Sequence, residues 1–249
     1  MEGIYVLKKD YEEITDRLVD WIQEKIEAAG CKGAVIGLSG GIDSSVTSVL
    51  AKRAFPDNTL GLIMPCYSNP QDEADAKKVA EKFDIPYQII DLDFVFDQFL
   101  TTLEGREGVE HESSAAANLK PRLRMAALYY YAHKRNSLVV GTDNRSELEI
   151  GYFTKFGDGG IDIAPLGNLV KSEVREVAKI LEIPEKIITK KPSAGLWSGQ
   201  TDEGELGFSY EELDKYILTG EARAEVQEKV DHLAEKNKHK LEMPPIPKF

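Results

Sequence analysis

The chain has 249 residues, of which 42% are hydrophobic and 30% charged, and its formal net charge is −12. This length accommodates one or two domains with a substantial core, and the acidic balance disfavours broad contact with nucleic acid or an anionic membrane. The two cysteines, Cys31 and Cys66, supply neither a disulfide framework nor a CxxC metal pair, so we expect two buried or idle thiols.

The N-terminal segment has no apolar signal-peptide core, and no run approaches the roughly 18 apolar residues of a membrane-spanning helix. We therefore expect a soluble cytoplasmic protein. Residues 1–30 carry apolar side chains at helical spacing and end at Gly30, which predicts an amphipathic helix.

Strand and helix patterns then alternate. Strands are expected at residues 33–38, 59–65, 86–92 and 137–142. Helices are expected at residues 44–55, 70–84 and 115–136. Pro121 must begin or kink the last of these helices. The alternation predicts an α/β fold, with an open, doubly wound parallel sheet that has helices on both faces.

The pattern changes after Asn144. One more helix is expected at residues 172–183, where Ser172 is closely followed by a glutamate. Irregular segments are expected at residues 155–165, 190–214 and 236–249. Long segments of this kind are often binding loops, and residues 198–209 are a candidate lid. Without repeats or low-complexity linkers, a single domain over residues 1–249 is the simplest interpretation.

The segment Ser39-Gly40-Gly41 separates the first strand from the following helix. Glycines there allow close approach to exposed backbone N–H groups, which together with the helix dipole suit phosphate oxygens. Asp43 would repel phosphate unless a divalent cation lies between them. The loop matches neither the Walker A nor the GxGxxG pattern. A plain turn capped by Asp43 is the alternative, but its place after the first strand favours a ligand site.

The SGGIDS sequence resembles the pyrophosphate-binding loop of the ATP pyrophosphatases, or PP-loop family. The resemblance implies an adenine nucleotide α-hydrolase-like, Rossmann-like sheet. It also implies a reaction in which ATP adenylates an oxygen, pyrophosphate leaves, and a nucleophile then displaces AMP.

The segment from Gly141 to Lys179, with its FTKFGDGG core, is similar to the signature of the ammonia-dependent NAD synthetases. The stretches NLKPRLRM and KKPSAGLW match the same family, so the resemblance covers almost the whole chain. It implies ATP- and Mg²⁺-dependent amidation of deamido-NAD to NAD with ammonia, through an adenylate. This is the last step of NAD biosynthesis.

The resemblance also implies roles for individual residues. ATP would be bound by Gly37, Leu38, Ser39, Gly40, Gly41, Ile42, Asp43, Ser44, Ser45, Thr142, Lys171 and Ser193. Mg²⁺ would be held by Asp43 and Glu147. Deamido-NAD would be bound by Arg122, Lys155, Asp162, His239 and Lys240. Among these, Asp43, Lys171 and Asp162 are the expected catalytic residues, with Asp162 or a neighbouring carboxylate taking a proton from ammonium.

Several of these residues have ordinary alternatives. Glu147 and Lys171 are otherwise solvated charges on helices, Ser193 is otherwise a cap or turn residue, and His239 with Lys240 otherwise belongs to a disordered basic tail. A lysine at a helix start is unfavourable beside the helix dipole, which weakens the alternative for Lys171.

Other functions remain to be weighed. A GMP synthetase unit lacks the FTKFGDGG segment, a tRNA-modifying thiolase or lysidine synthetase is disfavoured by the net charge of −12, and a non-catalytic nucleotide binder does not need Asp43, Glu147 and Lys171 together. The chain begins almost directly at the synthetase region, so we expect free ammonia as the donor, with a separate glutaminase left open. The family implies a homodimer, in which the AALYYYAH segment is either interface or core.

Overall fold

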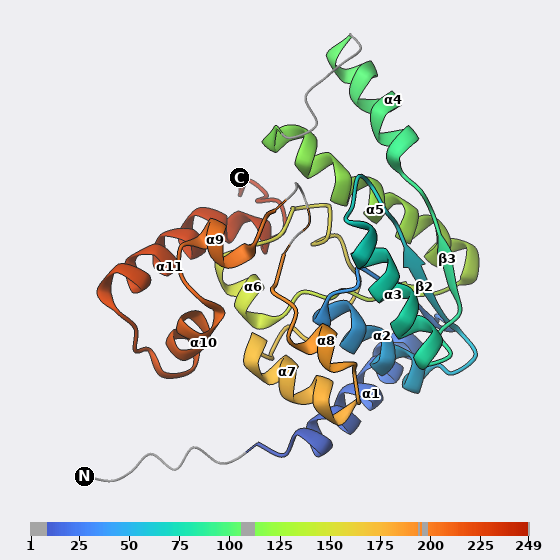
Figure 1. Ribbon diagram of the computed structural model, residues 1–249, viewed down its shortest axis with the longest axis horizontal. Helices are drawn as coiled ribbons and strands as arrows, with labels where there is room; N and C mark the ends of the chain where they lie inside the picture. Colours follow the sequence, from blue (N-terminus) through green and yellow to red (C-terminus); the bar gives the residue numbers. More distant parts are fainter. Residues whose placement is uncertain (1–8, 106–112, 194, 196–198, 249) are drawn as a thin grey trace.

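The computed structural model describes residues 9–105, 113–193, 195 and 199–248 (Figure 1). Its sheet has four strands in the order β3-β2-β1-β4. These are β1 (Ala34–Gly37), β2 (Thr59–Ile63), β3 (Tyr87–Ile89) and β4 (Leu138–Val139). Every pairing is parallel, and Ala34 lies opposite both Thr59 and Leu138, so the carboxyl ends of the strands share one edge. The predicted open parallel sheet is confirmed.

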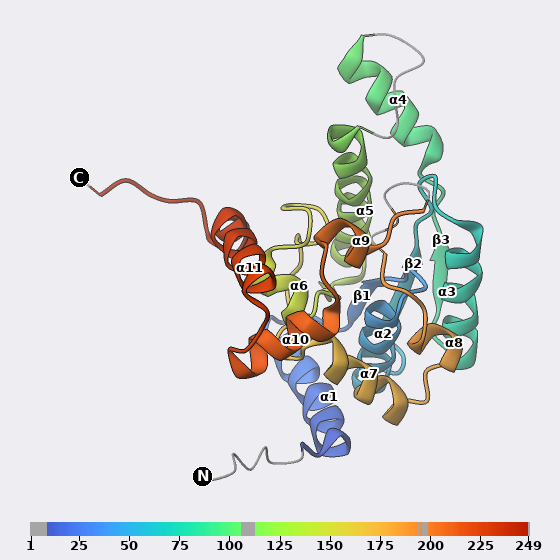
Figure 2. The same cartoon turned by 60° about the vertical axis from the view of Figure 1, so that its left-hand side comes forward.

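Helices cover both faces of the sheet (Figures 1 and 2). The first half of the chain supplies α1 (Tyr11–Ala28), α2 (Ile42–Ala54), α3 (Pro70–Lys82), α4 (Asp93–Glu104) and α5 (Ser114–Arg135). The second half supplies α6 (Arg145–Ile150), α7 (Lys171–Ile180), α8 (Glu185–Ile188), α9 (Asp202–Leu206), α10 (Tyr210–Thr219), α11 (Ala224–Asn237) and the short 3-10 helix η1 (Lys238–Lys240).

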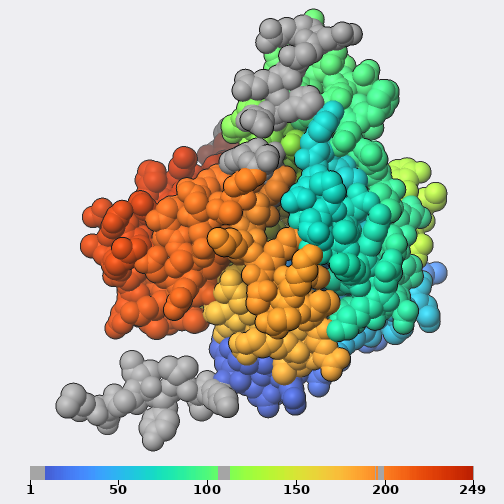
Figure 3. All heavy atoms as spheres, viewed as in Figure 1, coloured from blue at the N-terminus to red at the C-terminus, as the bar shows by residue number. Residues whose placement is uncertain are grey.

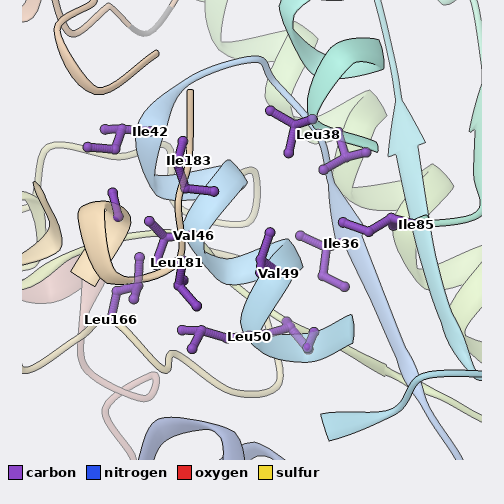
Figure 4. Packing of buried hydrophobic residues seen from close by; sticks show 14 of the residues in the cluster. Ile36, Leu38, Ile42, Val46, Val49, Leu50, Ile85, Leu166, Leu181 and Ile183 are labelled. Carbon is purple, nitrogen blue, oxygen red and sulfur yellow. The ribbon is translucent and has the colours of Figure 1, made fainter. Parts of the chain in front are cut away.

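One face of the sheet packs against α1, α2, α3 and α7. In Figure 4, Val46 and Val49 of α2 lie between Ile36 of β1 and Leu181, which follows α7. All four are at most 2% exposed. Burial of each such side chain contributes about 1.5–3 kcal/mol. This packing fixes the start of α2 against the end of β1, where the glycine loop lies.

The other face packs against α4 and α5, because alternate strand residues such as Val35 and Leu62 point to that side. Pro121 is buried within the first half of α5. Helix α4 was not predicted. Phe96 and Leu100, one turn apart, are its buried residues and belong to the second core cluster, and the segment carries too many outward apolar side chains to look amphipathic.

A third apolar cluster joins α6, α10 and α11 beside the sheet. The prediction of an irregular segment over residues 190–214 is wrong in part, since it contains α9 and the start of α10. Side chains of Thr201 and Ser209 cap these two helices, and Ser209 forms a capping box with Glu212. These caps are not apparent from the sequence, because the segment is otherwise rich in polar residues and glycine.

Of the helix predicted at residues 1–30, α1 confirms residues 11–28, and residues 1–8 lie outside the described part. The strand predicted at residues 137–142 is shorter than expected, since β4 has two residues. Residues 155–165 contain no helix or strand, although Ile163 forms an isolated bridge with Val140 beyond β4. The tail is irregular after η1. No helix in the described part of the chain has the length and apolar character to cross a bilayer. The cytoplasmic location and the single domain over residues 1–249 stay predictions.

Candidate active site

A cavity of about 1120 Å³ opens at the edge of the sheet where the parallel strands end. Its lining includes the glycine loop after β1, Met64 and Pro65 after β2, and Gly141 and Thr142 after β4. Open parallel sheets bind ligands at this edge. The cavity therefore lies where the sequence analysis expects the nucleotide.

The glycine loop presents an uncapped helix start to this cavity. The N-cap of α2 is Gly41, and no side chain in the described residues caps it. Ser39 Oγ lies 2.9 Å from Ser44 Oγ, and Ser45 Oγ donates to the Gly41 carbonyl at 2.7 Å. These bonds shape the turn while leaving backbone donors at the N-terminus of α2 for an anion. Asp43 is not the cap, so the plain-turn alternative does not describe this loop.

Gly40 has a backbone conformation and a contact that exclude other residues. Its φ is +77°, and a Cβ added there would lie 2.2 Å from the Asp72 carbonyl oxygen. The loop is thus pressed against the first turn of α3.

Lys171 joins the two carboxylates expected to bind a metal ion. Its Nζ lies 2.6 Å from Asp43 Oδ2 and 2.9 Å from Glu147 Oε1. The lysine side chain is 3% exposed and that of Glu147 is 14% exposed, so neither is a solvated surface charge. Asn144 Nδ2 donates to the other oxygen of Asp43 at 2.9 Å. Residues from the start of α2, the start of α6 and the start of α7 therefore meet in one ionic cluster, although α2 and α7 are more than a hundred residues apart in the sequence.

The surroundings of this cluster shift its acid–base properties. Burial raises the pKa of Glu147 to about 7, although Lys171 opposes that shift. Burial alone would lower the pKa of Lys171, but Asp43 and Glu147 outweigh it and the pKa is raised. The lysine is accordingly a permanent cation at neutral pH.

Helix α10 also contacts this cluster, which was not predicted from the sequence. The Tyr210 hydroxyl donates to Glu147 Oε1 at 3.3 Å, and the ring centroid lies 4.8 Å from Lys171 Nζ. Asp214 accepts from the backbone N–H of Ser172 at 2.7 Å and from Ser146 Oγ at 2.6 Å. A carboxylate at the start of α7 offsets the unfavourable placement of a lysine there. No local pattern in the sequence signals these long-range contacts.

A second unanticipated residue is Asp143, which lines the cavity and is 6% exposed. Its Oδ2 has no hydrogen-bond partner among the described residues. Burial, followed by repulsion from Asp158, raises the pKa of Asp143 well above its usual range. Burial also raises the pKa of Asp158.

Of the residues expected to bind deamido-NAD, one lines the cavity and four lie outside its lining. Arg122 Nη2 donates to the Lys155 carbonyl at 3.4 Å, and Lys155 Nζ donates to the His239 carbonyl. Lys240 Nζ donates to the carbonyls of Gly151 and Phe153 at 2.7 and 2.9 Å, and it lines the cavity. The four described residues Arg122, Lys155, Asp162 and His239 do not line it. The tail pair is therefore tied to the body of the protein.

Asp162 and Ser193 have clear structural partners. One Asp162 oxygen accepts from the Tyr129 hydroxyl at 3.0 Å and the other from the Val139 N–H at 2.8 Å. Ser193 lines the cavity, and its Oγ accepts from the Gly195 N–H at 3.1 Å, a turn-like bond. Part of the candidate lid lies in the described residues 199–209, but Ser198 lies outside them.

Comparison with known proteins identifies the family. The model of the NAD synthase family matches residues 14–244. The NH(3)-dependent NAD(+) synthetase of Carboxydothermus hydrogenoformans is 52% identical to this chain, over 97% of this chain and 99% of that protein.

Two solved structures cover nearly the whole chain. An NMN synthetase from Francisella tularensis superposes with a TM-score of 0.92 at 38% identity, over 97% of this chain and 100% of that one. An NH3-dependent NAD synthetase from Campylobacter jejuni has a TM-score of 0.78 at 34% identity, over 96% of this chain and 100% of that one. With the glycine loop and the Asp43–Lys171–Glu147 cluster at the expected edge of the sheet, these matches show that the chain belongs to the NAD synthase family.

Proposed function

We propose that this chain is an ammonia-dependent NAD synthetase, which amidates deamido-NAD to NAD with ATP. The nicotinate carboxylate attacks the α-phosphorus of ATP, and pyrophosphate leaves. Ammonia then attacks the acyl carbon of the adenylate, and AMP leaves. The observation that carries the proposal is the buried Asp43–Lys171–Glu147 cluster beside an open helix N-terminus.

The ATP site consists of the glycine loop and the residues around it. The N–H groups at the start of α2 and the hydroxyls of Ser39 and Ser44 are donors for phosphate oxygens. Thr142 and Ser193 line the same cavity. Lys171 places a positive charge where pyrophosphate leaves, which stabilises charge that grows in the transition state.

Asp43 and Glu147 fit a magnesium ion. Both carboxylates converge on one cation, the Lys171 ammonium, and oxygen ligands are the ones that Mg²⁺ prefers. A bound Mg²⁺ would neutralise negative charge on the phosphates. These two carboxylates would hold the ion, and the Lys171 ammonium would then be available to the phosphate oxygens.

Deamido-NAD is assigned to Arg122, Lys155, Asp162, His239 and Lys240. The first two and the tail pair form a basic group next to the cavity, which suits a dinucleotide pyrophosphate. The assignment of Asp162 rests on the family resemblance, since both of its oxygens accept hydrogen bonds within the protein. For accepting a proton from ammonium, Asp143 is better suited than Asp162, because it lines the cavity and its Oδ2 has no partner among the described residues.

A homodimer is supported by the outer face of α4. Val95, Phe99 and Leu103 follow one another at four-residue spacing and are 45%, 43% and 62% exposed. In both views α4 stands out from the body of the protein (Figures 1 and 2). By contrast, Leu128, Tyr129 and Tyr131 of the AALYYYAH segment pack against the second core cluster. The apolar stripe on α4 is the surface that a second copy would cover.

A second candidate function is amidation of nicotinic acid mononucleotide to NMN. It is favoured by the higher TM-score with the Francisella tularensis NMN synthetase, 0.92 against 0.78 for the Campylobacter jejuni NAD synthetase. The same carboxyl group is activated in both reactions, so the loop, Lys171 and the carboxylates serve either one. The two candidates differ only in what binds the remainder of the substrate.

The deciding experiment offers purified protein ATP, Mg²⁺ and either deamido-NAD or nicotinic acid mononucleotide, with ammonium or glutamine as donor. Products are separated by chromatography, and pyrophosphate is measured in parallel. NAD formed from ammonium supports the proposal, whereas a higher kcat/KM for the mononucleotide supports the second candidate. A folded protein that binds ATP and yields no amide from either substrate would contradict both and favour a non-catalytic binder or another PP-loop substrate.

A further inference from the structure

The glycine loop, α3 and the segment after α8 meet at the wall of the cavity, where Lys190 of the third segment contacts the other two. Lys190 lies between α8 and Ser193. Its Nζ is 2.6 Å from Asp72 Oδ1 and 3.2 Å from Asp75 Oδ2, both on α3, and it donates to the Gly40 carbonyl at 3.2 Å. The lysine therefore joins the loop after β1 to the helix after β2.

The carboxylate partner of Lys190 is firmly held. Asp75 is 1% exposed, and its other oxygen accepts from Lys186 Nζ at 2.8 Å and from Gln71 Nε2 at 2.9 Å. Burial would raise the pKa of Asp75, but the bonds from Lys186 and Lys190 outweigh it and the pKa is lowered. Asp75 is thus an ionised anchor that fixes the Lys190 ammonium.

The contact with Gly40 sets the direction of one peptide group. The Gly40 carbonyl and the Gly41 N–H belong to the same trans peptide and point in opposite directions. Lys190 holds the carbonyl on the α3 side, so the Gly41 N–H is turned to the other side, where it donates to Ser39 Oγ at 3.3 Å. Ser39 and Gly41 line the cavity, as do Lys190 and Asp72 farther along its wall. Glycine peptides flip easily, and a flipped peptide would turn its carbonyl oxygen towards the phosphates.

We propose that Lys190 is a positioning residue for the ATP site. Asp72 and Asp75 fix its ammonium, and the ammonium holds the Gly40 carbonyl, which keeps the N–H of the Gly40–Gly41 peptide towards the cavity. Because Ser193 follows three residues later, the same anchor ties the Ser193 segment to the loop. The inference rests on the proposed ATP site.

Lys186 provides a matched control. Both lysines pair with Asp75, but only Lys190 reaches Gly40. In the variant K190M, KM for ATP rises about tenfold, as expected for one lost charge-assisted hydrogen bond. KM for deamido-NAD stays within about twofold of wild type. K186M keeps the wild-type KM for ATP. In K190R, KM for ATP stays close to the wild-type value, because the guanidinium can donate both to the Gly40 carbonyl and to the carboxylates of α3.

A second measurement needs neither substrate nor activity. Amide hydrogen exchange of residues 39–45 in the ligand-free protein is compared between wild type, K190M and K186M. We expect faster exchange in K190M only, with equal melting temperatures for the two variants. Unchanged exchange with a raised KM would make Lys190 a direct phosphate ligand and overturn the positioning role. An equal effect of K186M on KM or on exchange would also overturn it. If the wild type makes no NAD, the exchange result still decides the role of Lys190.

Discussion

At the scale of single residues, Lys171 is the counter-ion of Asp43 and Glu147, and in the proposed function it is also the cation for phosphate oxygens. Its ammonium lies between Asp43 and Glu147, where a metal ion would also be attracted most strongly by the two carboxylates. Two buried carboxylates without a cation would repel each other strongly. A metal ion bound by this pair, as proposed above, would therefore compete with Lys171 until a nucleotide supplied oxygens for the lysine.

This competition predicts the metal binding of a lysine variant. K171M without nucleotide should bind Mn²⁺ between about tenfold and about a thousandfold more tightly than wild type, because a unit charge at 4 Å contributes up to about 4 kcal/mol near a protein surface. Electron paramagnetic resonance of free Mn²⁺ measures this affinity without turnover. The melting temperature of K171M should also rise on Mn²⁺ addition.

The control is K179M, which removes an exposed lysine from the same helix and should leave Mn²⁺ affinity unchanged. NAD formation by K171M should fall at least about a hundredfold, since a group that stabilises transition-state charge is lost. Equal Mn²⁺ affinity in K171M and wild type would rule out the competition.

Cys66 allows a separate prediction from its pKa. Burial raises the pKa of this thiol to about 11, so at pH 8 only about one molecule in a thousand carries the reactive thiolate. We expect an aromatic disulfide reagent at pH 8 to modify one of the two thiols quickly, and that one to be Cys31. The Cys66 rate should rise about tenfold per pH unit up to the pKa.

In the denatured protein both thiols should react quickly with the reagent. In the folded C66A variant only the slow reaction should be lost. Two equally fast thiols in the folded protein would contradict the assignment of Cys66 as a buried, idle cysteine. The expectation of a buried thiol is confirmed for Cys66, which is 0% exposed, whereas Cys31 is only partly buried.

At the scale of elements, the glycine loop shows how local and distant forces combine. The turn between β1 and α2 needs a residue with positive φ, and Gly40 supplies it locally. Its close approach to Asp72 depends instead on how α3 packs on the sheet. Gly30, at the end of α1, also has positive φ but has open space around it.

A pair of alanine variants separates these two contributions. G40A and G30A both incur about 1–2 kcal/mol for a left-handed alanine. Only G40A adds an overlap with the Asp72 carbonyl, so we expect it to lose about 1–3 kcal/mol more stability on urea denaturation. KM for ATP should rise in G40A and stay unchanged in G30A. Equal losses of stability in both variants would show that α3 yields to the new methyl group.

At the scale of the whole molecule, helix α4 presents a stripe of exposed apolar side chains. In Figure 3 the body presents a continuous surface of side chains, with the α4 region at its upper end. The outer stripe Val95, Phe99 and Leu103 extends along that helix. Burying such a stripe against its symmetry mate is the simplest way to remove it from water.

Substitution of this stripe tests the dimer. F99E should convert a dimer into a monomer in sedimentation equilibrium, because a buried unpaired charge at an interface costs several kcal/mol. L218E, at a 49% exposed leucine of α10, is the matched control and should leave the mass unchanged. A wild-type monomer at micromolar concentration, or an F99E dimer, would contradict α4 as the interface.

The sequence by itself determined the parts that depend on neighbours along the chain. Alternating apolar periods predicted the parallel sheet, and the glycine loop and signature segment brought out Asp43, Glu147 and Lys171 through family resemblance. Helix α4 and the caps of α9 and α10 were missed, because their local signals are weak beside the packing that stabilises them.

Only the tertiary structure decided which side chains meet. The support of Glu147 by Tyr210, the anchoring of Gly40 by Lys190 and the two bonds that engage Asp162 join segments up to 150 residues apart. Helix and strand periods arise from backbone geometry over a few residues, so they can be read locally. Contacts between distant segments depend on how whole elements pack around a common core, and no short stretch of sequence contains that information.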